Sequence, residues 1–249
     1  MMTRGGRIFV ILNAFFIGFL VLAELFGAKL FNVDVSWTWI LPALGEDRLA
    51  MTLGVIPFPA TFIITDLLNE YYGRKSVRFT TLLGMTVLVG IYLMIFAVCG
   101  IPANDISAVS DEAFRAVFFN SQAIIIGSIV AYLIGQLIDI QVFHRLRNWT
   151  GGRHIWLRAT GSTIISQLID SFVVIYLGLG LLAENPISFT DATDIARNNF
   201  LFKMLIAIAI TPLIYLGHKL INRHLGPEAD HLRERASKGE PFVTPFSPG

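Results

Sequence analysis

A motif of amide and carboxylate side chains occurs twice in the chain, as Gln136-Leu137-Ile138-Asp139 and as Gln167-Leu168-Ile169-Asp170. Positions three apart lie on the same face of a helix, so in each copy the amide and the carboxylate point the same way. Each copy lies inside an apolar run long enough to cross a bilayer, where ionisable residues are costly and often functional. The two pairs predict one buried polar site between successive helices.

The carboxylates of these motifs need a compensating environment. A bare carboxylate in hydrocarbon costs at least about 2–3 kcal/mol, so Asp139 and Asp170 must be paired, protonated or open to a wet cavity. Arg158 is the cation that the sequence suggests. It precedes Asp170 by too many residues for a local contact, so we expect it to pair with Asp66, Glu70 or Asp139 on neighbouring helices. The alternative is that these polar groups only hold the bundle together.

A third polar group follows Pro57-Phe58-Pro59. The two prolines remove backbone donors and predict a break or kink in the span, a device that exposes polar main chain near ligand sites. Asp66, Asn69 and Glu70 come next, at spacings of three and four, and therefore share a helix face. For Glu70 the alternative is a helix-end pair with Arg74.

The first apolar run carries Glu24 towards its outer end, on the same stripe as Asn13. Two interpretations are equally supported: a carboxylate that binds ligand or carries a proton, or an interfacial residue that reaches the headgroups. Asp66 and Asp139 are the other candidates for proton coupling.

The composition sets the class of protein that must position these residues. The chain has 249 residues, 54% hydrophobic and 15% charged, and a mean hydropathy of +0.65. This is an integral membrane protein. A single cysteine excludes a disulfide framework, and a net charge of +1 gives no basic field that would favour nucleic acid.

Apolar runs predict an all-α fold of about six transmembrane helices in one bundle. The runs cover residues 8–26, 51–68, 79–101, 116–143, 155–183 and 200–221. Residues 31–50, with Trp37 and Trp39, are expected to form a connector at the interface of lipid and water. Residues 1–225 thus form the transmembrane domain, and the polar, proline-containing residues 226–249 are expected to be a disordered cytoplasmic tail.

The charge distribution predicts the orientation. With the amino terminus inside, most of the 19 basic residues fall in cytoplasmic segments, as the positive-inside rule requires. The basic residues left outside are Lys29, Arg48, Arg115, Arg197 and Lys203. Both termini are therefore expected in the cytoplasm.

Several strings together resemble the queuosine precursor transporter family, also called the vitamin-uptake-type VUT family. They are AELFGAK (23–29), FPATF (58–62), TDLLNEYYG (65–73), GQLID (135–139), WLRAT (156–160) and SQLIDS (166–171). The resemblance implies import, across the inner membrane of a bacterium, of 7-cyano-7-deazaguanine or 7-aminomethyl-7-deazaguanine, which are intermediates on the way to queuosine in tRNA.

The polar residues fit the ligand that this resemblance implies. A guanine-like ring has adjacent N–H donors that one carboxylate accepts together, and an oxo group that an amide or guanidinium can meet. The candidate acceptors are Asp66, Glu70, Asp139 and Asp170. The candidate partners of the oxo group are Asn69, Gln136, Arg158 and Gln167. Phe58, Phe62 and Trp156 could stack on the ring, although aromatic residues usually serve packing.

Other function classes have less support. The histidines fall at the cytoplasmic ends or in the tail, and the chain has neither a zinc-protease His pair nor a phosphate-binding loop. We therefore expect no enzyme, no cofactor and no metal. The alternatives are a substrate-binding membrane subunit of an ATP-driven vitamin importer and, with less support, an Asp-based intramembrane enzyme. The expected partners are a small deazapurine and the lipid bilayer, without nucleic acid, and the sequence leaves a homodimer open. Transport is expected either to be coupled to protons or to be facilitated diffusion.

Overall fold

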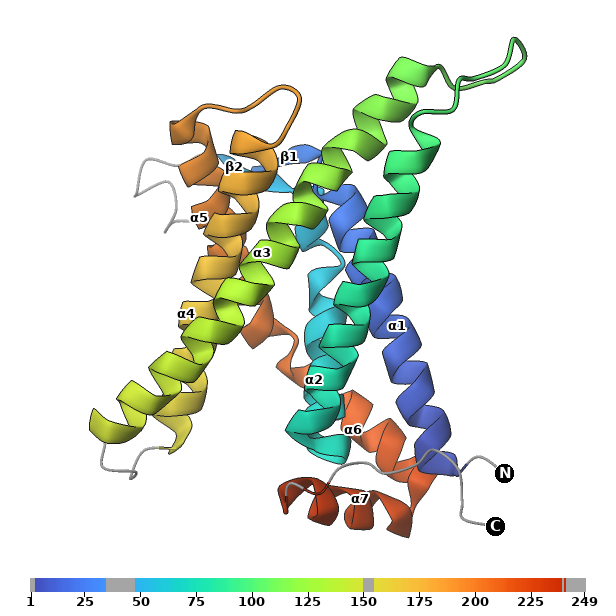
Figure 1. Cartoon of the computed structure of the whole chain (residues 1–249). Coiled ribbons are helices and arrows are strands. Elements are labelled where there is room, and N and C mark those ends of the chain that lie inside the picture. The colour runs from blue at the N-terminus through green and yellow to red at the C-terminus, as the bar shows by residue number, and fades with distance from the viewer. Residues whose placement is uncertain (1–2, 35–47, 150–154, 239, 241–249) are drawn as a thin grey trace. The chain divides into compact units, whose positions relative to one another are not determined.

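The computed structural model describes residues 3–34, 48–149, 155–238 and 240 (Figure 1). Of residues 136–149 and 155–163 it describes the backbone only. The chain is almost entirely helical, as expected, and divides into two compact units. The first unit comprises Met1–Ala23, Ile56–Gly90 and Leu205–Gly249, and the second comprises Glu24–Val55 and Ile91–Met204.

The first unit contains most of α1 (Arg4–Phe26), the larger part of α2 (Phe58–Val98), α6 (Thr211–Leu225) and α7 (Pro227–Ser237). Its core is built around Leu68, Tyr71 and Tyr72, none of which is more than 2% exposed. Apolar side chains of α1, α6 and α7 pack against these three residues. The unit therefore buries the middle of α2 on several sides.

The second unit contains α3 (Asp111–Trp149), α4 (Ile155–Ile175) and most of α5 (Phe189–Ala209). Figure 1 shows α3 and α4 side by side. A π-helical turn, Tyr176–Leu181, continues α4. The connector after α1 begins and ends as an antiparallel pair, β1 (Leu30–Asp34) with β2 (Arg48–Thr52), in which Leu30 faces Thr52 and Asp34 faces Arg48. The sequence analysis did not predict these strands, and Trp37 and Trp39 lie outside the described residues.

The described helices confirm a membrane protein by length and composition. Four of them are apolar and long enough to cross a bilayer, or five if α5 and α6, which meet at a 48° bend, form one span. Most of the second and third predicted spans lies in the single element α2, although the second begins in β2 and the third extends beyond Val98, and the sixth extends across the bend between α5 and α6. The predicted number of six is thus not reproduced as six separate helices.

The break in α2 lies at Gly73 and not at the prolines. Pro59 stands in the first turn of α2, where its missing N–H leaves no helical bond unmade, and residues 53–55 form a 3₁₀ turn before it. Gly73 has φ 77° and ψ 169°, far from helical values, and separates the two halves of α2. This conformation is essentially restricted to glycine.

We expect Gly73→Ala to destabilise the first unit by about 1–3 kcal/mol, because a Cβ is strained at this φ and ψ. The new Cβ would also lie 3.4 Å from backbone atoms of Ala236 in α7. The midpoint of thermal unfolding in detergent measures the effect. Gly90→Ala is the control, since no described atom lies within 4 Å of its Cβ position and alanine favours a helix. Equal midpoints for the two variants would contradict this explanation.

Residues 227–237, expected to be disordered, form α7. Gly226, with φ 57°, allows the turn from α6, and Pro227 opens the helix. Ala229 and Leu232 are buried, so this mostly polar helix has one apolar stripe that packs on the core. At its end the Lys238 ammonium donates a hydrogen bond to Glu234 over 2.7 Å and holds the pKa of that carboxyl below its ordinary value. The short apolar stripe explains why composition alone did not reveal the helix.

Candidate functional site

An ion pair joins α4 and α5 in the second unit. The Lys203 Nζ of α5 is 2.7 Å from Asp170 Oδ2 of α4. Lys203 is 7% exposed, and the Asp170 side chain is 32% exposed. Such a short charge-assisted hydrogen bond compensates both charges in a site of low polarity. Asp170 is therefore paired, and its partner is Lys203, which the charge distribution of the sequence assigns to the outside of the membrane.

A second carboxylate belongs to the same cluster. Glu24, near the end of α1, is 8% exposed and accepts a hydrogen bond of 2.8 Å from the Ser128 hydroxyl of α3. Glu24 also lies within electrostatic range of both Asp170 and Lys203. Two helical turns before Ser128 on α3, the Ser121 hydroxyl donates a hydrogen bond of 3.0 Å to the Leu25 carbonyl. Ser121 and Ser128 are seven residues apart, so one face of α3 fixes the end of α1.

Two buried polar atoms of α4 have no hydrogen-bond partner among the described residues. They are Gln167 Oε1 and Ser171 Oγ, and Ser171 is 2% exposed. Positions 167, 170 and 171 lie on one side of a helix, so both atoms share a side with Asp170. A buried polar atom without a partner costs about 1–3 kcal/mol. The arrangement is that of a site in which a ligand or water completes the bonding.

Two asparagines of α5 hold the strand pair beside this cluster. Asn199 accepts a hydrogen bond from the Thr52 backbone N–H (3.2 Å) and donates to the Thr52 hydroxyl (3.1 Å). Asn198 donates to the Ala50 carbonyl over 3.2 Å. Thr52, Asn198 and Asn199 are all buried. Strand β2 is thus attached to the helix that carries Lys203, one turn further on.

Small residues allow the close crossing of α3 and α4 that brings their polar groups together. A Cβ on Gly127 would lie 3.0 Å from the Val174 carbonyl oxygen and 3.3 Å from the Gly178 nitrogen. A Cβ on Gly178 would lie 3.1 Å from the Ile124 Cα. These neighbours are backbone atoms, which a rotamer change cannot move. Glycine at both positions therefore sets the separation of the two helices.

The cluster has an unbalanced charge. Two carboxylates, Glu24 and Asp170, share one ammonium, that of Lys203. If all three groups are ionised, one negative charge is left without a counter-charge among the described side chains, which is unfavourable in a buried site. The site is therefore suited to a ligand that brings hydrogen-bond donors, a positive charge or a proton. Among the described residues, no group of three or more His, Cys, Asp and Glu side chains could hold a metal ion.

The first unit has its own polar network, centred on Tyr71. The Tyr71 hydroxyl donates to Asn222 Oδ1 over 2.7 Å and accepts from Arg233 Nη2 over 2.9 Å. The Arg233 guanidinium also lies over the Tyr71 ring, 4.8 Å from its centroid. His218 Nε2 is 3.4 Å from Asp66 Oδ2, and its ring packs against Tyr71. The network joins α2, α6 and α7.

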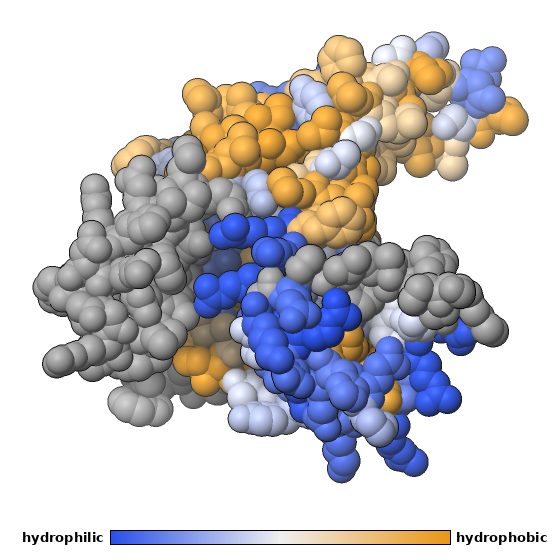
Figure 2. Space-filling view, turned by 60° about the horizontal axis from the view of Figure 1, so that its bottom comes forward, coloured by the Kyte–Doolittle hydropathy of each residue, from blue (hydrophilic) through white to orange (hydrophobic). Residues whose placement is uncertain are grey.

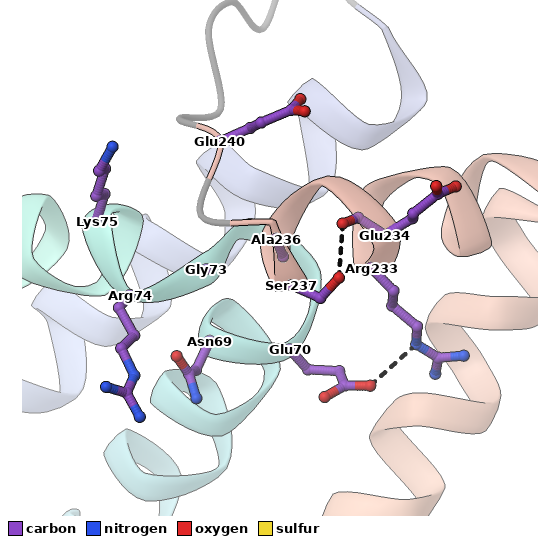
Figure 3. A pocket seen from close by; sticks show the side chains of 10 residues that line it. All are labelled: Asn69, Glu70, Gly73, Arg74, Lys75, Arg233, Glu234, Ala236, Ser237 and Glu240. Carbon is purple, nitrogen blue, oxygen red and sulfur yellow. Dashed lines mark hydrogen bonds and ion pairs between the residues drawn. The ribbon is translucent and has the colours of Figure 1, made fainter. Parts of the chain in front are cut away.

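A pocket of about 770 Å³ opens beside this network between α2 and α7. Figure 3 shows Glu70 pointing to Arg233, whose Nε is 3.2 Å from Glu70 Oε1, and not to Arg74 as one interpretation of the sequence suggested. Glu70 and Arg233 thus form an ion pair, but among the described residues no atom accepts a hydrogen bond of regular geometry from Arg233 Nε. Asn69, Gly73 and Lys75 also line the pocket. Figure 2, which brings this end of the first unit forward, shows hydrophilic surface there.

We expect Tyr71→Phe to destabilise the first unit by about 1–3 kcal/mol, because Asn222 and Arg233 lose a buried partner. The ring, and with it the stacking on Arg233, is retained. Thermal unfolding of the purified protein measures the loss. Tyr215→Phe is the matched control, since Tyr215 is 72% exposed. A control variant that loses as much stability as Tyr71→Phe would show that the hydroxyl network is unimportant.

The predicted site residues are divided between the two units. Glu24, Gln167 and Asp170 lie in the second unit, where Asp170 pairs with Lys203 and Glu24 is within electrostatic range of both. The first unit holds Asp66, Asn69, Glu70, Phe58 and Phe62, and the two phenylalanines pack edge to face at 4.9 Å. The side chains of Gln136, Asp139, Trp156 and Arg158 lie outside the described part of the chain.

Sequence reasoning missed Lys203, Ser171, Asn198 and Asn199 as parts of the site. Lys203 lies at the outer end of the sixth apolar run, 200–221, so the sequence places it with the basic residues outside the membrane. In the structure α5 begins at Phe189, so these residues lie well inside a helix. Asn199 and Lys203 are four apart and share a face. The spacing of four between Asn199 and Lys203, followed by an apolar run, is the feature of the sequence that could have indicated that both lie on one face of a membrane helix.

Comparison with known proteins gives consistent matches. Residues 52–217 match the family described as "Putative vitamin uptake transporter". A Bacillus subtilis protein named "Probable queuosine precursor transporter" is 30% identical over 178 residues, which are 70% of this chain and 74% of the relative. The Escherichia coli "Queuosine precursor transporter" is 30% identical over 170 residues, 63% of this chain and 67% of the relative.

A Haemophilus influenzae protein, also named "Probable queuosine precursor transporter", is 25% identical over 205 residues, 81% of this chain and 82% of the relative. All three bacterial relatives are thus named as transporters and not as enzymes. No solved structure matches the chain.

Proposed function

Because the chain belongs to the vitamin-uptake-type family, whose matched relatives are named queuosine precursor transporters, we propose that it imports a queuosine precursor. The substrate is 7-cyano-7-deazaguanine, 7-aminomethyl-7-deazaguanine or both. The buried cluster of Glu24, Asp170 and Lys203 is the observation that carries this proposal, because it combines acceptors with an uncompensated charge. It is a polar site in an otherwise apolar membrane protein.

Asp170 and Gln167 are proposed to read the polar edge of the ring. The Asp170 carboxylate accepts the ring N–H and the 2-amino group together, and the Lys203 ammonium, 2.7 Å away, holds it in place. Gln167 Oε1 and Ser171 Oγ, which have no hydrogen-bond partner among the described residues, supply further bonds to the substrate or its water. A ligand that lacks these donors leaves buried acceptors unsatisfied, so selection by the site should be strong.

The other candidate residues predicted from the sequence are proposed to contact the substrate along its path through the protein. Asp66, Asn69 and Glu70 line one face of α2; Asp66 faces the His218 ring and Glu70 faces the Arg233 guanidinium. Phe58 and Phe62 are the aromatic candidates on the same helix. Gln136, Asp139, Trp156 and Arg158 are carried forward from the sequence alone.

The proposed location is the bacterial inner membrane, with both termini in the cytoplasm. The distribution of basic residues supports this orientation, and the burial of Lys203 removes one exception to it. A membrane-impermeant maleimide tests it in a Cys99→Ser background. Spheroplasts should be labelled at Ser107→Cys and not at Ser237→Cys; the reverse pattern would invert the proposed topology.

Uptake in a host that can neither make nor import the precursors tests the function. Expression of this chain should restore queuosine in tRNA when either deazaguanine base is supplied outside. Asp170→Asn should lower the restoration at least about ten-fold, because a carboxylate that accepts two donors is lost. Asp105→Asn is the control, since Asp105 lies in an exposed loop. Full restoration by Asp170→Asn would remove this carboxylate from the site.

Reconstitution distinguishes the transporter from a subunit of an ATP-driven importer. Proteoliposomes that contain only this chain should accumulate or equilibrate labelled precursor without ATP. Uptake that requires a separate ATPase would favour the alternative.

A further inference from the structure

We infer that the charge of the substrate decides whether a proton is carried with it through the Glu24, Asp170 and Lys203 cluster. A neutral deazapurine, such as the cyano base, binds together with one proton on Glu24. A deazapurine that bears an ammonium group supplies the missing positive charge itself and moves without that proton. The inference rests on the proposed function and extends it to the stoichiometry of transport.

The charge count is the first step. Glu24 is reached by two charged groups of the described residues, Asp170 from α4 and Lys203 from α5. α3 contributes a neutral hydroxyl, that of Ser128. Glu24 and Lys203 are both more than nine-tenths buried. Without ligand or proton the cluster carries one excess negative charge, and a site of low polarity disfavours it.

The second step identifies which carboxylate takes the proton. Asp170 has an ammonium at 2.7 Å, so its carboxylate already has a direct counter-charge. The neighbour of Glu24 is a hydroxyl at 2.8 Å. A hydroxyl can donate to a carboxylate or accept from a carboxylic acid, so this bond survives protonation by rotation of one O–H bond. Glu24 can change its charge without a rearrangement of the helices.

The third step concerns the ligand. Ser171 is 2% exposed, and its Oγ has no partner among the described residues, as is also true of Gln167 Oε1. These atoms lie on the Asp170 side of α4, so a ligand bound beside Asp170 can bond to them. A substrate ammonium in that position would bring the sum of charges to zero. A neutral nitrile in the same position leaves the sum at minus one unless Glu24 is protonated.

Proton counting in proteoliposomes tests the inference with the unmodified protein. An entrapped pH dye and labelled substrate measure protons and substrate in the same sample. We expect about one proton to enter with each cyano base and none to enter with each aminomethyl base. An inward proton gradient should accordingly stimulate uptake of the cyano base only. The same proton count for both substrates would overturn the inference, while transport of either would leave the proposed function intact.

Glu24→Gln provides the second measurement, because glutamine is neutral at any pH and keeps a partner for Ser128. We expect cyano-base uptake to lose its response to the gradient. The ratio of cyano-base to aminomethyl-base uptake should rise at least about ten-fold, because the cation loses a buried counter-charge. Gel filtration verifies that the variant is folded. A retained gradient response would overturn the role of Glu24, and no uptake of either base by the unmodified protein would sink the proposed function itself.

Discussion

Replacement of Lys203 by methionine is expected to reduce precursor uptake about a hundred-fold. Methionine preserves the length and the apolar stem of the side chain but leaves Glu24 and Asp170 without their ammonium. Loss of one partner of a buried ion pair costs about 3–5 kcal/mol, and the partial exposure of Asp170 places the cost at the lower end. Thermal unfolding and uptake measured on the same preparation report the two effects separately.

The double variant Asp170→Asn with Lys203→Met separates stability from binding. It removes both charges of the pair, so most of the lost stability should return. Uptake should stay low, because the carboxylate proposed to accept the ring donors is absent. Lys29→Met is the control for loss of a lysine, since Lys29 is exposed. Recovery of uptake together with stability would mean that the pair only supports the fold.

Gly127→Ala is expected to have the second large effect, on the crossing of α3 and α4. The added methyl group meets the Val174 carbonyl oxygen at 3.0 Å and two more backbone atoms at 3.3 Å. Because backbone atoms cannot rotate away, the helices must separate, at a cost of about 1–3 kcal/mol. Ser128 adjoins the crossing, so its bond to Glu24 should lengthen and uptake should fall together with the unfolding temperature.

Gly135→Ala is the matched control for this experiment. It makes the same change on the same helix, two turns along, where no described atom lies within 4 Å of the new methyl group. We expect it to be neutral or slightly stabilising, because alanine favours a helix over glycine. Similar losses in the two variants would show that the close crossing does not position the site.

Hydropathy and polar spacing predicted the class of the protein and part of the site. An intramembrane carboxylate is expensive, so Asp170 and Glu24 stood out in the sequence, and the structure places both in one cluster. Their cation could not be found in the same way. Lys203 lies near the edge of an apolar run, where a lysine at an interface and a buried lysine look alike. Only the register of α4 against α5 distinguishes the two.

The local breaks were harder to predict than the helices. Proline is a reliable breaker inside a helix, but at the first turn it is well tolerated, and Pro59 stands there. The break occurs at Gly73, where a Cβ would lie 3.4 Å from backbone atoms of Ala236, a residue distant in the sequence. The strands β1 and β2 are short, and β2 is bonded to α5 through Thr52 and Asn199, which are 147 positions apart in the sequence. Such long-range contacts have no local signature.

The bonds of Asn198 and Asn199 to β2 have a mechanical consequence. Strand β2 and helix α5 are tied at two successive residues, and Lys203 follows one helical turn later. If the strand pair moves, either these three hydrogen bonds break or α5 moves with the strands and carries Lys203 away from Asp170. The position of strand β2 is therefore linked, through α5, to the charge balance of the buried site.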